Sequence, residues 1–255
     1  MNRYFVELSY WGTHYAGWQV QPNAVTVQST IEEAISTILN VPTSTMGCGR
    51  TDSGVHASQF FLHFEAQDIP ENLIYRLNKF LPKDIAIKRI FPVREKAHTR
   101  HDAKYRAYEY RIHFDKNPFL FGHSYFYPWL PLDRAAMETA VKMLAKYKNF
   151  KSFEKTNSDA RTSLCDIYRS ELAWDDQANR LTFHIAANRF LRGMVRLIVG
   201  SILMVGKGKI NLAEFQKGIE EQSRFGINIS APAQGLFLNE VRYNWEEILP
   251  SQSQD

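Results

Sequence analysis

The sequence predicts an α+β fold, because runs with the two-residue period of strands alternate with runs of helical spacing. The chain has 255 residues and an apolar fraction of 44%, enough for one large domain or two ordinary ones. No run of about 18 apolar residues occurs, so no membrane-spanning helix is expected. The two halves share an order of strands and helices, although no residue-level repeat links them. We therefore expect two α+β domains with strands and helices interleaved.

The elements of the first half alternate strand, helix, strand, helix and strand. Strands are expected over residues 3–9, 59–64 and 84–91, and helices over residues 26–39 and 70–81. In the second half, strands are expected over 105–114, 164–174, 181–187 and 235–243, and helices over 132–144, 190–205 and 212–221. The strands at 164–174 and 181–187 suggest a hairpin across 175–177.

The polar, basic stretch 95–104 is the only boundary that the composition suggests. It gives an N-terminal α+β domain over 1–104, a C-terminal α+β domain over 105–246 and a loose tail over 247–255.

The cysteine content and the N-terminus suggest a soluble cytoplasmic protein. Cys48 and Cys165 form neither a disulfide framework nor a zinc quartet and fit reduced thiols. The chain starts with an alternating strand pattern instead of a charged segment followed by an apolar one. Cys48 could act as a nucleophile, but no local feature activates it. Motifs for nucleotide hydrolysis, dinucleotide redox chemistry and zinc catalysis are missing, and the histidines do not pair at ligand spacing.

The charge distribution suits an anionic partner. The net charge is +4 and the pI is about 8.9. Two stretches alternate basic and aromatic residues, as phosphate contact combined with base stacking requires. The alternative is a solvated helix face and an ordinary aromatic strand. The first stretch contains Lys142, Lys146, Lys148, Lys151 and Lys155 with Tyr147, Phe150 and Phe153; the second contains Arg100, Lys104, Arg106 and Arg111 with Tyr105, Tyr108 and Tyr110.

A glycine-punctuated turn over 47–57 is the first candidate for chemistry. It places the Asp52 carboxylate beside the Arg50 guanidinium with almost no bulk around them. Glycine is used where the backbone turns left-handed or where another molecule approaches closely, so the pattern suggests a presented carboxylate. The alternative is an Asx-turn in which Asp52 bonds only its own backbone.

Two further segments contribute polar side chains to apolar surroundings. Strand periodicity places Tyr108 on one face with Tyr110, where its phenol could stack on a base or could be an ordinary core tyrosine. Helical periodicity places Arg192 and Arg196 one turn apart in an apolar segment. An arginine there needs a partner, for which Asp52 is the natural carboxylate, or it reaches solvent; Arg196 fits the paired alternative better.

Together these segments resemble the TruA family of tRNA pseudouridine synthases, and the resemblance runs nearly end to end. The opening signature is Tyr10-x-Gly12-x-x-Tyr15-x-Gly17-Trp18-Gln19-x-Gln21 followed by Thr26-Val27-Gln28, and the catalytic motif is Gly49-Arg50-Thr51-Asp52-Ser53-Gly54-Val55-His56-Ala57. The other segments are Arg106-x-Tyr108-x-Tyr110, Phe190-Leu191-x-x-Met194-Val195-Arg196-x-x-Val199-Gly200 and Ala233-x-Gly235-Leu236-x-Leu238. Five motifs in this order are specific, whereas any one of them is weak.

The resemblance implies a role for each matching position. Asp52 becomes the catalytic aspartate, and Arg50 helps to displace or replace the target base. Tyr108 stacks on the flipped uracil, Arg196 is the partner of Asp52, and Leu236 is a wall of the pocket. Two positions depart from the family pattern: Trp11 stands where aspartate is common, and Ser53 where alanine is usual.

The resemblance also implies the fold, the substrate and the assembly. We expect two ferredoxin-like α/β subdomains whose largely antiparallel sheets join around a central basic cleft, the pseudouridine synthase fold. The substrate is the anticodon stem-loop of tRNA at positions 38, 39 and 40, and the enzyme is a homodimer.

The chemistry of this isomerisation fits a single carboxylate. It breaks the bond from C1′ to N1, turns the base and forms a bond from C1′ to C5, which requires no cofactor, metal or redox partner. Asp52 could attack C1′, add to C6 or promote departure of the uracil, and the residues do not choose among these routes. Since the target base is stacked in a stem, it must be everted first. One carboxylate instead of a flanking pair also disfavours glycoside hydrolysis.

Overall fold

The computed structural model describes residues 1–156, 161–223, 225 and 230–250. The chain divides into two compact units, one comprising 1–105 with 238–255 and the other 106–237. It passes from the first unit to the second inside strand β5 (Ala103–His113) and returns inside strand β9 (Leu236–Tyr243).

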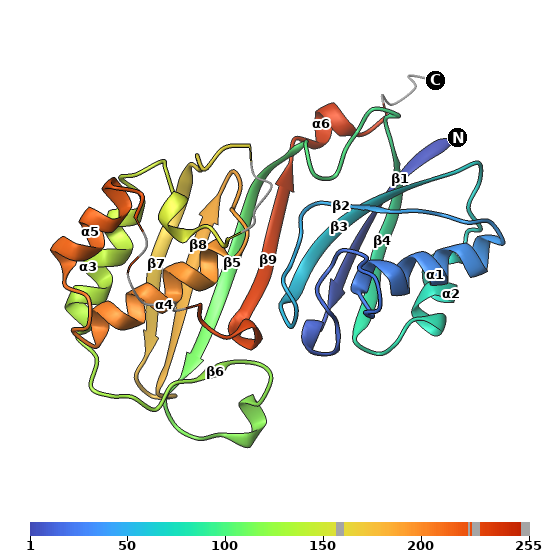
Figure 1. The fold of residues 1–255 in the computed structure, drawn as a ribbon. Coiled ribbons are helices and arrows are strands. Elements are labelled where there is room, and N and C mark those ends of the chain that lie inside the picture. Colours follow the sequence, from blue (N-terminus) through green and yellow to red (C-terminus); the bar gives the residue numbers. More distant parts are fainter. Residues whose placement is uncertain (157–160, 224, 226–229, 251–255) are drawn as a thin grey trace. The chain divides into compact units, whose positions relative to one another are not determined.

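The first unit contains an antiparallel sheet with two helices on one face (Figure 1). Strand β1 (Asn2–Tyr10) lies between β3 (His56–Ala66) and β4 (Ile85–Val93), and the short β2 (Met46–Gly47) pairs with β3. Helices α1 (Val27–Leu39) and α2 (Leu73–Phe80) cover the sheet with buried aliphatic side chains. The helix α6 (Trp245–Ile248) and the 3-10 turn η1 (Gly12–His14) complete the unit.

The second unit repeats the arrangement of an antiparallel sheet with helices. Strand β8 (Arg180–Ala187) lies between β5 and β7 (Ile167–Asp175), and β6 (Tyr125–Phe126) pairs parallel with β5. The helices are α3 (Arg134–Leu144), α4 (Met194–Gly206) and α5 (Leu212–Glu220), and the 3-10 turns are η2 (Pro118–Leu120), η3 (Lys151–Phe153) and η4 (Ala233–Gly235).

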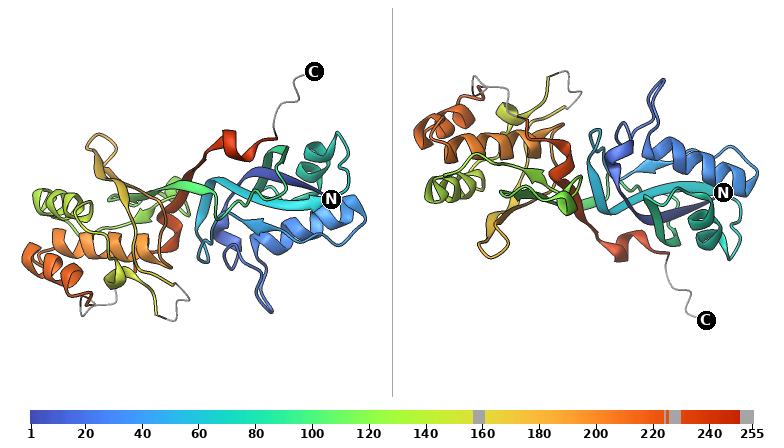
Figure 2. Two further views of the ribbon diagram at one scale, coloured as in Figure 1. Left: turned by 90° about the horizontal axis from the view of Figure 1, so that it is seen from above. Right: turned by 90° about the horizontal axis from the view of Figure 1, so that it is seen from below.

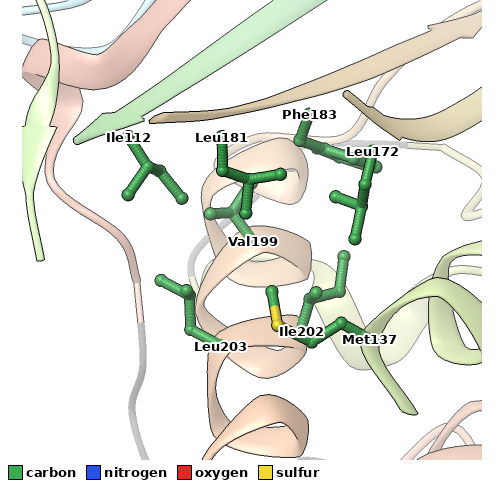
Figure 3. Close-up of a pocket in the computed structure, with 8 residues that line it drawn as sticks. All are labelled: Ile112, Met137, Leu172, Leu181, Phe183, Val199, Ile202 and Leu203. Carbon is green, nitrogen blue, oxygen red and sulfur yellow. The ribbon is translucent and has the colours of Figure 1, made fainter. Parts of the chain in front are cut away.

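Apolar side chains from α3, α4 and the sheet form the core of the second unit (Figure 3). They surround a cavity of about 10 Å³, close to the minimum for one water molecule. Its lining is formed by Ile112, Met137, Leu172, Leu181, Phe183, Val199, Ile202 and Leu203. The core is therefore closely packed against the same sheet that carries Tyr108.

The predicted α+β class and the largely antiparallel pairing are confirmed, while several element boundaries differ. The hairpin at 175–177 forms as expected, with Asp175 opposite Arg180. The helix expected over 190–205 begins only at Met194, because Gly193 adopts a left-handed conformation with φ of 69°. The placement of Arg192 and Arg196 one helical turn apart was therefore wrong, since Arg192 precedes the helix.

The end of the chain also differs from its description as a loose tail over 247–255. Residues Trp245–Ile248 form α6, and Ile248 is buried; residues 251–255 lie outside the described residues. The boundary expected between residues 104 and 105 lies next to the observed one between 105 and 106. The expected C-terminal domain over 105–246, however, includes residues 238–246, which belong to the first unit.

Candidate active site

The loop that carries Asp52 connects β2 to β3 in the first unit. Its entry is fixed by Cys48, whose backbone N–H donates to the Phe61 carbonyl at 2.7 Å. Its exit is a turn in which the Val55 N–H donates to the Asp52 carbonyl at 3.1 Å and Gly54 has a φ of 76°. The glycine in the turn is thus required by the backbone conformation.

The opening motif of the chain packs against this loop through backbone hydrogen bonds. The Trp18 N–H donates to the Thr51 carbonyl at 3.2 Å, and the Gly54 N–H donates to the Tyr15 carbonyl at 3.3 Å. The Tyr10 hydroxyl and the Thr51 hydroxyl are hydrogen-bonded at 2.9 Å. Bonds on both sides of Asp52 therefore hold its backbone in one position.

Two glycines of the opening motif allow this close approach. A Cβ on Gly17 would lie 2.5 Å from the Thr51 carbonyl oxygen, and Gly17 has a φ of 92°. A Cβ on Gly12 would lie 1.9 Å from the Val55 carbonyl oxygen. Neither position can accept a side chain unless the loop shifts, which explains why two motifs distant in sequence belong together.

The side chains of the loop alternate between the core and the surface. Arg50 is exposed, Thr51 is buried and Asp52 is half-buried. The loop thus presents the guanidinium and the carboxylate at the surface of the first unit while Thr51 anchors it inward. An exposed guanidinium can contact a polyanion, and a half-buried carboxylate can meet a substrate without complete desolvation.

The two departures from the family pattern have identifiable contacts. The Trp11 ring stacks on the His56 ring with centroids 3.9 Å apart, and the Gly12 N–H donates to His56 Nδ1 at 3.0 Å. The Ser53 hydroxyl donates to the Tyr15 carbonyl at 3.2 Å. Both departures therefore add contacts between the opening motif and the Asp52 loop.

Tyr108 lies in β5 of the second unit, opposite Ile185 of β8. It is half-buried, and its ring meets the Phe190 ring edge-on at 5.1 Å. Its neighbour on the same strand face, Tyr110, is completely buried and donates its hydroxyl to the Pro232 carbonyl at 2.7 Å. Burial raises the pKa of Tyr110, and the nearby Tyr125 raises it further, whereas Arg196 lowers it. Tyr110 is therefore a core tyrosine with a hydrogen-bonded hydroxyl, whereas Tyr108 is only half-buried.

Arg196 lies in the first turn of α4 in the second unit and is tied to the segment before η4. Its Nε donates to the Ala231 carbonyl at 2.6 Å, and the Ala231 N–H donates to the Arg196 carbonyl at 3.0 Å. The Nε bond fixes the direction of the guanidinium, and the backbone bond holds Ala231 beside the start of α4. Leu236 follows as the first residue of β9 and is 6% exposed.

Asp52 and Arg50 belong to the first unit, whereas Tyr108, Arg196 and Leu236 belong to the second. Named contacts hold the Asp52 backbone, the Tyr108 ring and the Arg196 side chain, and the pairing of Asp52 with Arg196 stays a prediction. Sequence reasoning assigned no role to Phe190 or Ala231, which position Tyr108 and Arg196. Phe190 is part of the motif that contains Arg196, whereas Ala231 lies two residues before the Ala233 motif and carries no sequence signal of its own.

One interpretation of the basic stretches was wrong. Phe150 and Phe153 are completely buried, so they form core and cannot stack on bases. The lysines of that stretch are exposed, and two of them form ion pairs, Lys148 with Asp166 and Lys151 with Glu154. The stacking part of the interpretation is therefore excluded for these two rings, whereas phosphate contact by the exposed lysines stays a prediction.

Both cysteines are buried. Cys48 is completely buried and its sulfur accepts from the Phe61 N–H at 3.4 Å. Burial raises the pKa of Cys165 to about 11. Over residues 1–156, 161–223, 225 and 230–250, no three His, Cys, Asp or Glu side chains could jointly hold a metal ion. In that same part of the chain, every helix is too short or too polar to span a membrane.

Comparison with known proteins identifies the family. A family model described as tRNA pseudouridine synthase matches residues 140–244. The tRNA pseudouridine synthase A of Azobacteroides pseudotrichonymphae is 42% identical over 248 residues, covering 96% of this chain and 98% of the relative. This chain belongs to the tRNA pseudouridine synthase A family.

Other members of the tRNA pseudouridine synthase A family match over the same extent. The protein from Porphyromonas gingivalis is 44% identical over 247 residues, with 95% of this chain and 98% of the relative covered. The protein from Parabacteroides distasonis is 42% identical over 255 residues, covering 98% and 99%. The resemblance found in the motifs is confirmed, and so is the predicted enzyme class, an isomerase that converts uridine to pseudouridine.

Proposed function

We propose that this chain converts uridine to pseudouridine at positions 38, 39 and 40 in the anticodon stem-loop of tRNA, with Asp52 as the catalytic carboxylate. The observation that carries the proposal is the near full-length similarity to tRNA pseudouridine synthases A, which includes the Asp52 loop. The anchoring of that loop by the opening motif supports it, since a catalytic carboxylate needs a fixed position.

The proposed roles of the other residues follow from their environments. Arg50 is exposed beside Asp52 and displaces or replaces the target base. Tyr108 stacks on the everted uracil, which its half-buried ring supports. Arg196 keeps Asp52 ionised, because an adjacent cation favours the charged form of a carboxyl group. Leu236 gives the pocket an apolar wall.

The proposal includes the finer features of the fold and the assembly. The two units form ferredoxin-like subdomains around a central basic cleft, and the enzyme works as a homodimer in the cytoplasm. The antiparallel sheet with helices in each unit supports the first of these features. The net charge of +4 is consistent with a polyanionic substrate.

The atoms of the reaction balance without a second substrate. The bond between C1′ and N1 breaks, the uracil turns, and C1′ bonds to C5. The proton on C5 leaves, and N1 gains one. Asp52 supplies the negative charge or the nucleophile for the first step, and the eversion of the base costs a few kcal/mol that stacking on Tyr108 offsets.

Position mapping on tRNA tests the proposal. Carbodiimide treatment followed by reverse transcription should give stops at positions 38, 39 and 40 after incubation with the enzyme. Asp52→Asn should abolish these stops, whereas Asp68→Asn, at an exposed aspartate of the same unit, should keep them. A binding protein without activity would give no stops with the unaltered chain. A hydrolase would release free uracil. Either result would refute the proposed function.

A further inference from the structure

The segment 19–25, here called the finger, projects from the first unit between η1 and α1. In both views of Figure 2 the part of the chain between β1 and α1 stands out from its unit as a blue loop. All seven residues of the finger are exposed, and they include two valines, Val20 at 48% and Val25 at 64%. Exposed valines on the two sides of a projecting loop suggest a contact surface.

The finger is held in one shape by hydrogen bonds at its sides. The Gln21 side-chain amide donates to the Ala16 carbonyl at 2.8 Å, and the Val20 N–H donates to Gln28 Oε1 at 3.2 Å. Gln21 and Ala24 form an antiparallel bridge across the tip, where Asn23 has a φ of 59°. Because these bonds order the finger before it binds, the entropic cost of a contact is lowered.

The root of the finger is bonded to the Asp52 loop. The Ala16 N–H donates to the Val25 carbonyl at 2.9 Å, and the Val27 N–H donates to the Gly17 carbonyl at 3.1 Å. The adjacent Trp18 N–H donates to the Thr51 carbonyl next to Asp52. The finger and the catalytic loop thus form one frame, so a substrate that meets Asp52 is presented to the finger at a fixed position.

The composition of the finger indicates which part of a substrate it meets. Its residues Gln19, Val20, Gln21, Pro22, Asn23, Ala24 and Val25 carry no charge. Phosphate contacts in RNA complexes come mostly from arginine and lysine, whereas amides and small apolar groups fit riboses, 2′-hydroxyls and base edges in the shallow groove of a stem. We propose that the finger docks against the sugar and groove side of the tRNA stem next to the target uridine, an inference that rests on the proposed function.

A charge probe at the tip tests the proximity to RNA. Asn23→Asp should weaken tRNA binding about three- to tenfold at low salt, and the effect should shrink as salt screens the new charge. The matched control is Asn40→Asp. Asn40 is also exposed and left-handed, and it caps the C-terminal end of α1. The finger precedes the start of α1, whereas Asn40 follows its end. The 13 residues of α1 make this helix about 20 Å long. The control variant should bind tRNA like the unaltered chain.

A second variant tests the contact itself. The double substitution Val20→Ser and Val25→Ser removes exposed methyl groups, so the fold should persist while tRNA affinity falls about tenfold at every salt concentration. A filter-binding titration across salt concentrations measures both variants, with circular dichroism and sedimentation as checks. The inference is overturned if both variants bind tRNA like the Asn40→Asp control. It is also overturned if they change only the oligomeric state, which would make the finger a contact between copies of the chain.

The same experiment separates this inference from the proposed function. If the unaltered chain gives no stops in reverse transcription at positions 38 to 40, the proposed function fails. If it gives stops and the finger variants bind and convert tRNA at its level, only the finger inference fails.

Discussion

The Asp52 loop and the Tyr108–Arg196 region position their polar side chains in different ways. The loop is held mainly by backbone hydrogen bonds and by two glycines that admit close contact. Tyr108 and Arg196 instead lie on a strand and a helix packed around an apolar core (Figure 3). The loop should therefore be sensitive to backbone substitutions. The second region should be sensitive to single side-chain contacts.

Gly17→Ala should have the largest effect and break the first half of this comparison. The new Cβ would meet the Thr51 carbonyl, and the φ of 92° is strained for alanine. We expect a loss of about 2–4 kcal/mol in the free energy of unfolding of the first unit and at least about 100-fold in the conversion rate. Urea unfolding and single-turnover conversion measure the two losses.

Gly49→Ala is the control for that substitution in the same loop. A Cβ on Gly49 meets nothing within 4 Å, so the free energy of unfolding should stay close to that of the unaltered chain. Equal losses in the two variants would show that the contact of Gly17 with the loop is not what matters.

Acid should destabilise the first unit through His63. Burial, together with the nearby cation Arg3 and with His98, lowers the pKa of His63 to about 4, whereas the unfolded value is about 6.5. Between these values the unfolded chain binds a proton that the folded chain excludes. Stability should be complete above pH 6.5 and fall by up to about 3 kcal/mol as the pH drops to 4.

Urea unfolding from pH 7.5 to 4 measures this loss, and His63→Gln should reduce the slope. Since burial also lowers the pKa of His98, part of the slope should remain in that variant. A slope that is unchanged by His63→Gln would contradict the assignment.

Arg196→Lys should sharpen the description of the second region. Lysine keeps the charge but loses the Nε bond to the Ala231 carbonyl, so it no longer fixes the direction of the cation. We expect stability to fall by about 1–2 kcal/mol and conversion to fall about tenfold or more, with tRNA affinity little changed.

Arg192→Lys is the matched control because Arg192 is exposed and precedes the helix. Arg192→Lys should lower the free energy of unfolding by less than about 0.5 kcal/mol. If both substitutions slow conversion equally, the orientation of Arg196 is not the cause.

Tyr110→Phe should give the smallest effect. It removes the hydroxyl that donates to the Pro232 carbonyl and retains the ring, so stability should fall by about 1–2 kcal/mol. Because Tyr110 serves the core, conversion per folded molecule should not change. A large loss of conversion with unchanged stability would give Tyr110 the role proposed for Tyr108.

The sequence allowed the Asp52 loop to be found because its signal is local. Glycines around Arg50 and Asp52 indicate a special backbone whatever the rest of the chain does. In contrast, Tyr108 and Tyr110 share one strand face, and only packing shows that Tyr110 is core. Composition likewise did not reveal that Phe150 is buried beneath exposed lysines.

The start of α4 shows a second limit of sequence patterns. Helical spacing continues back through Arg192, but the left-handed Gly193 breaks the helix before Met194. Periodicity reports which residues face a core and does not report the conformation of one glycine. The spacing of Arg192 and Arg196 was therefore misread, although Arg196 itself lies on the predicted helix.

We propose that the Asp52 carboxylate performs the isomerisation. The direct test is the single-turnover rate of pseudouridine formation by Asp52→Asn at saturating enzyme, with the tRNA dissociation constant measured in parallel. The substitution removes a charge and almost no volume, so affinity should stay within about threefold while the rate falls at least about 1,000-fold. Conversion at the rate of the unaltered chain would contradict the account.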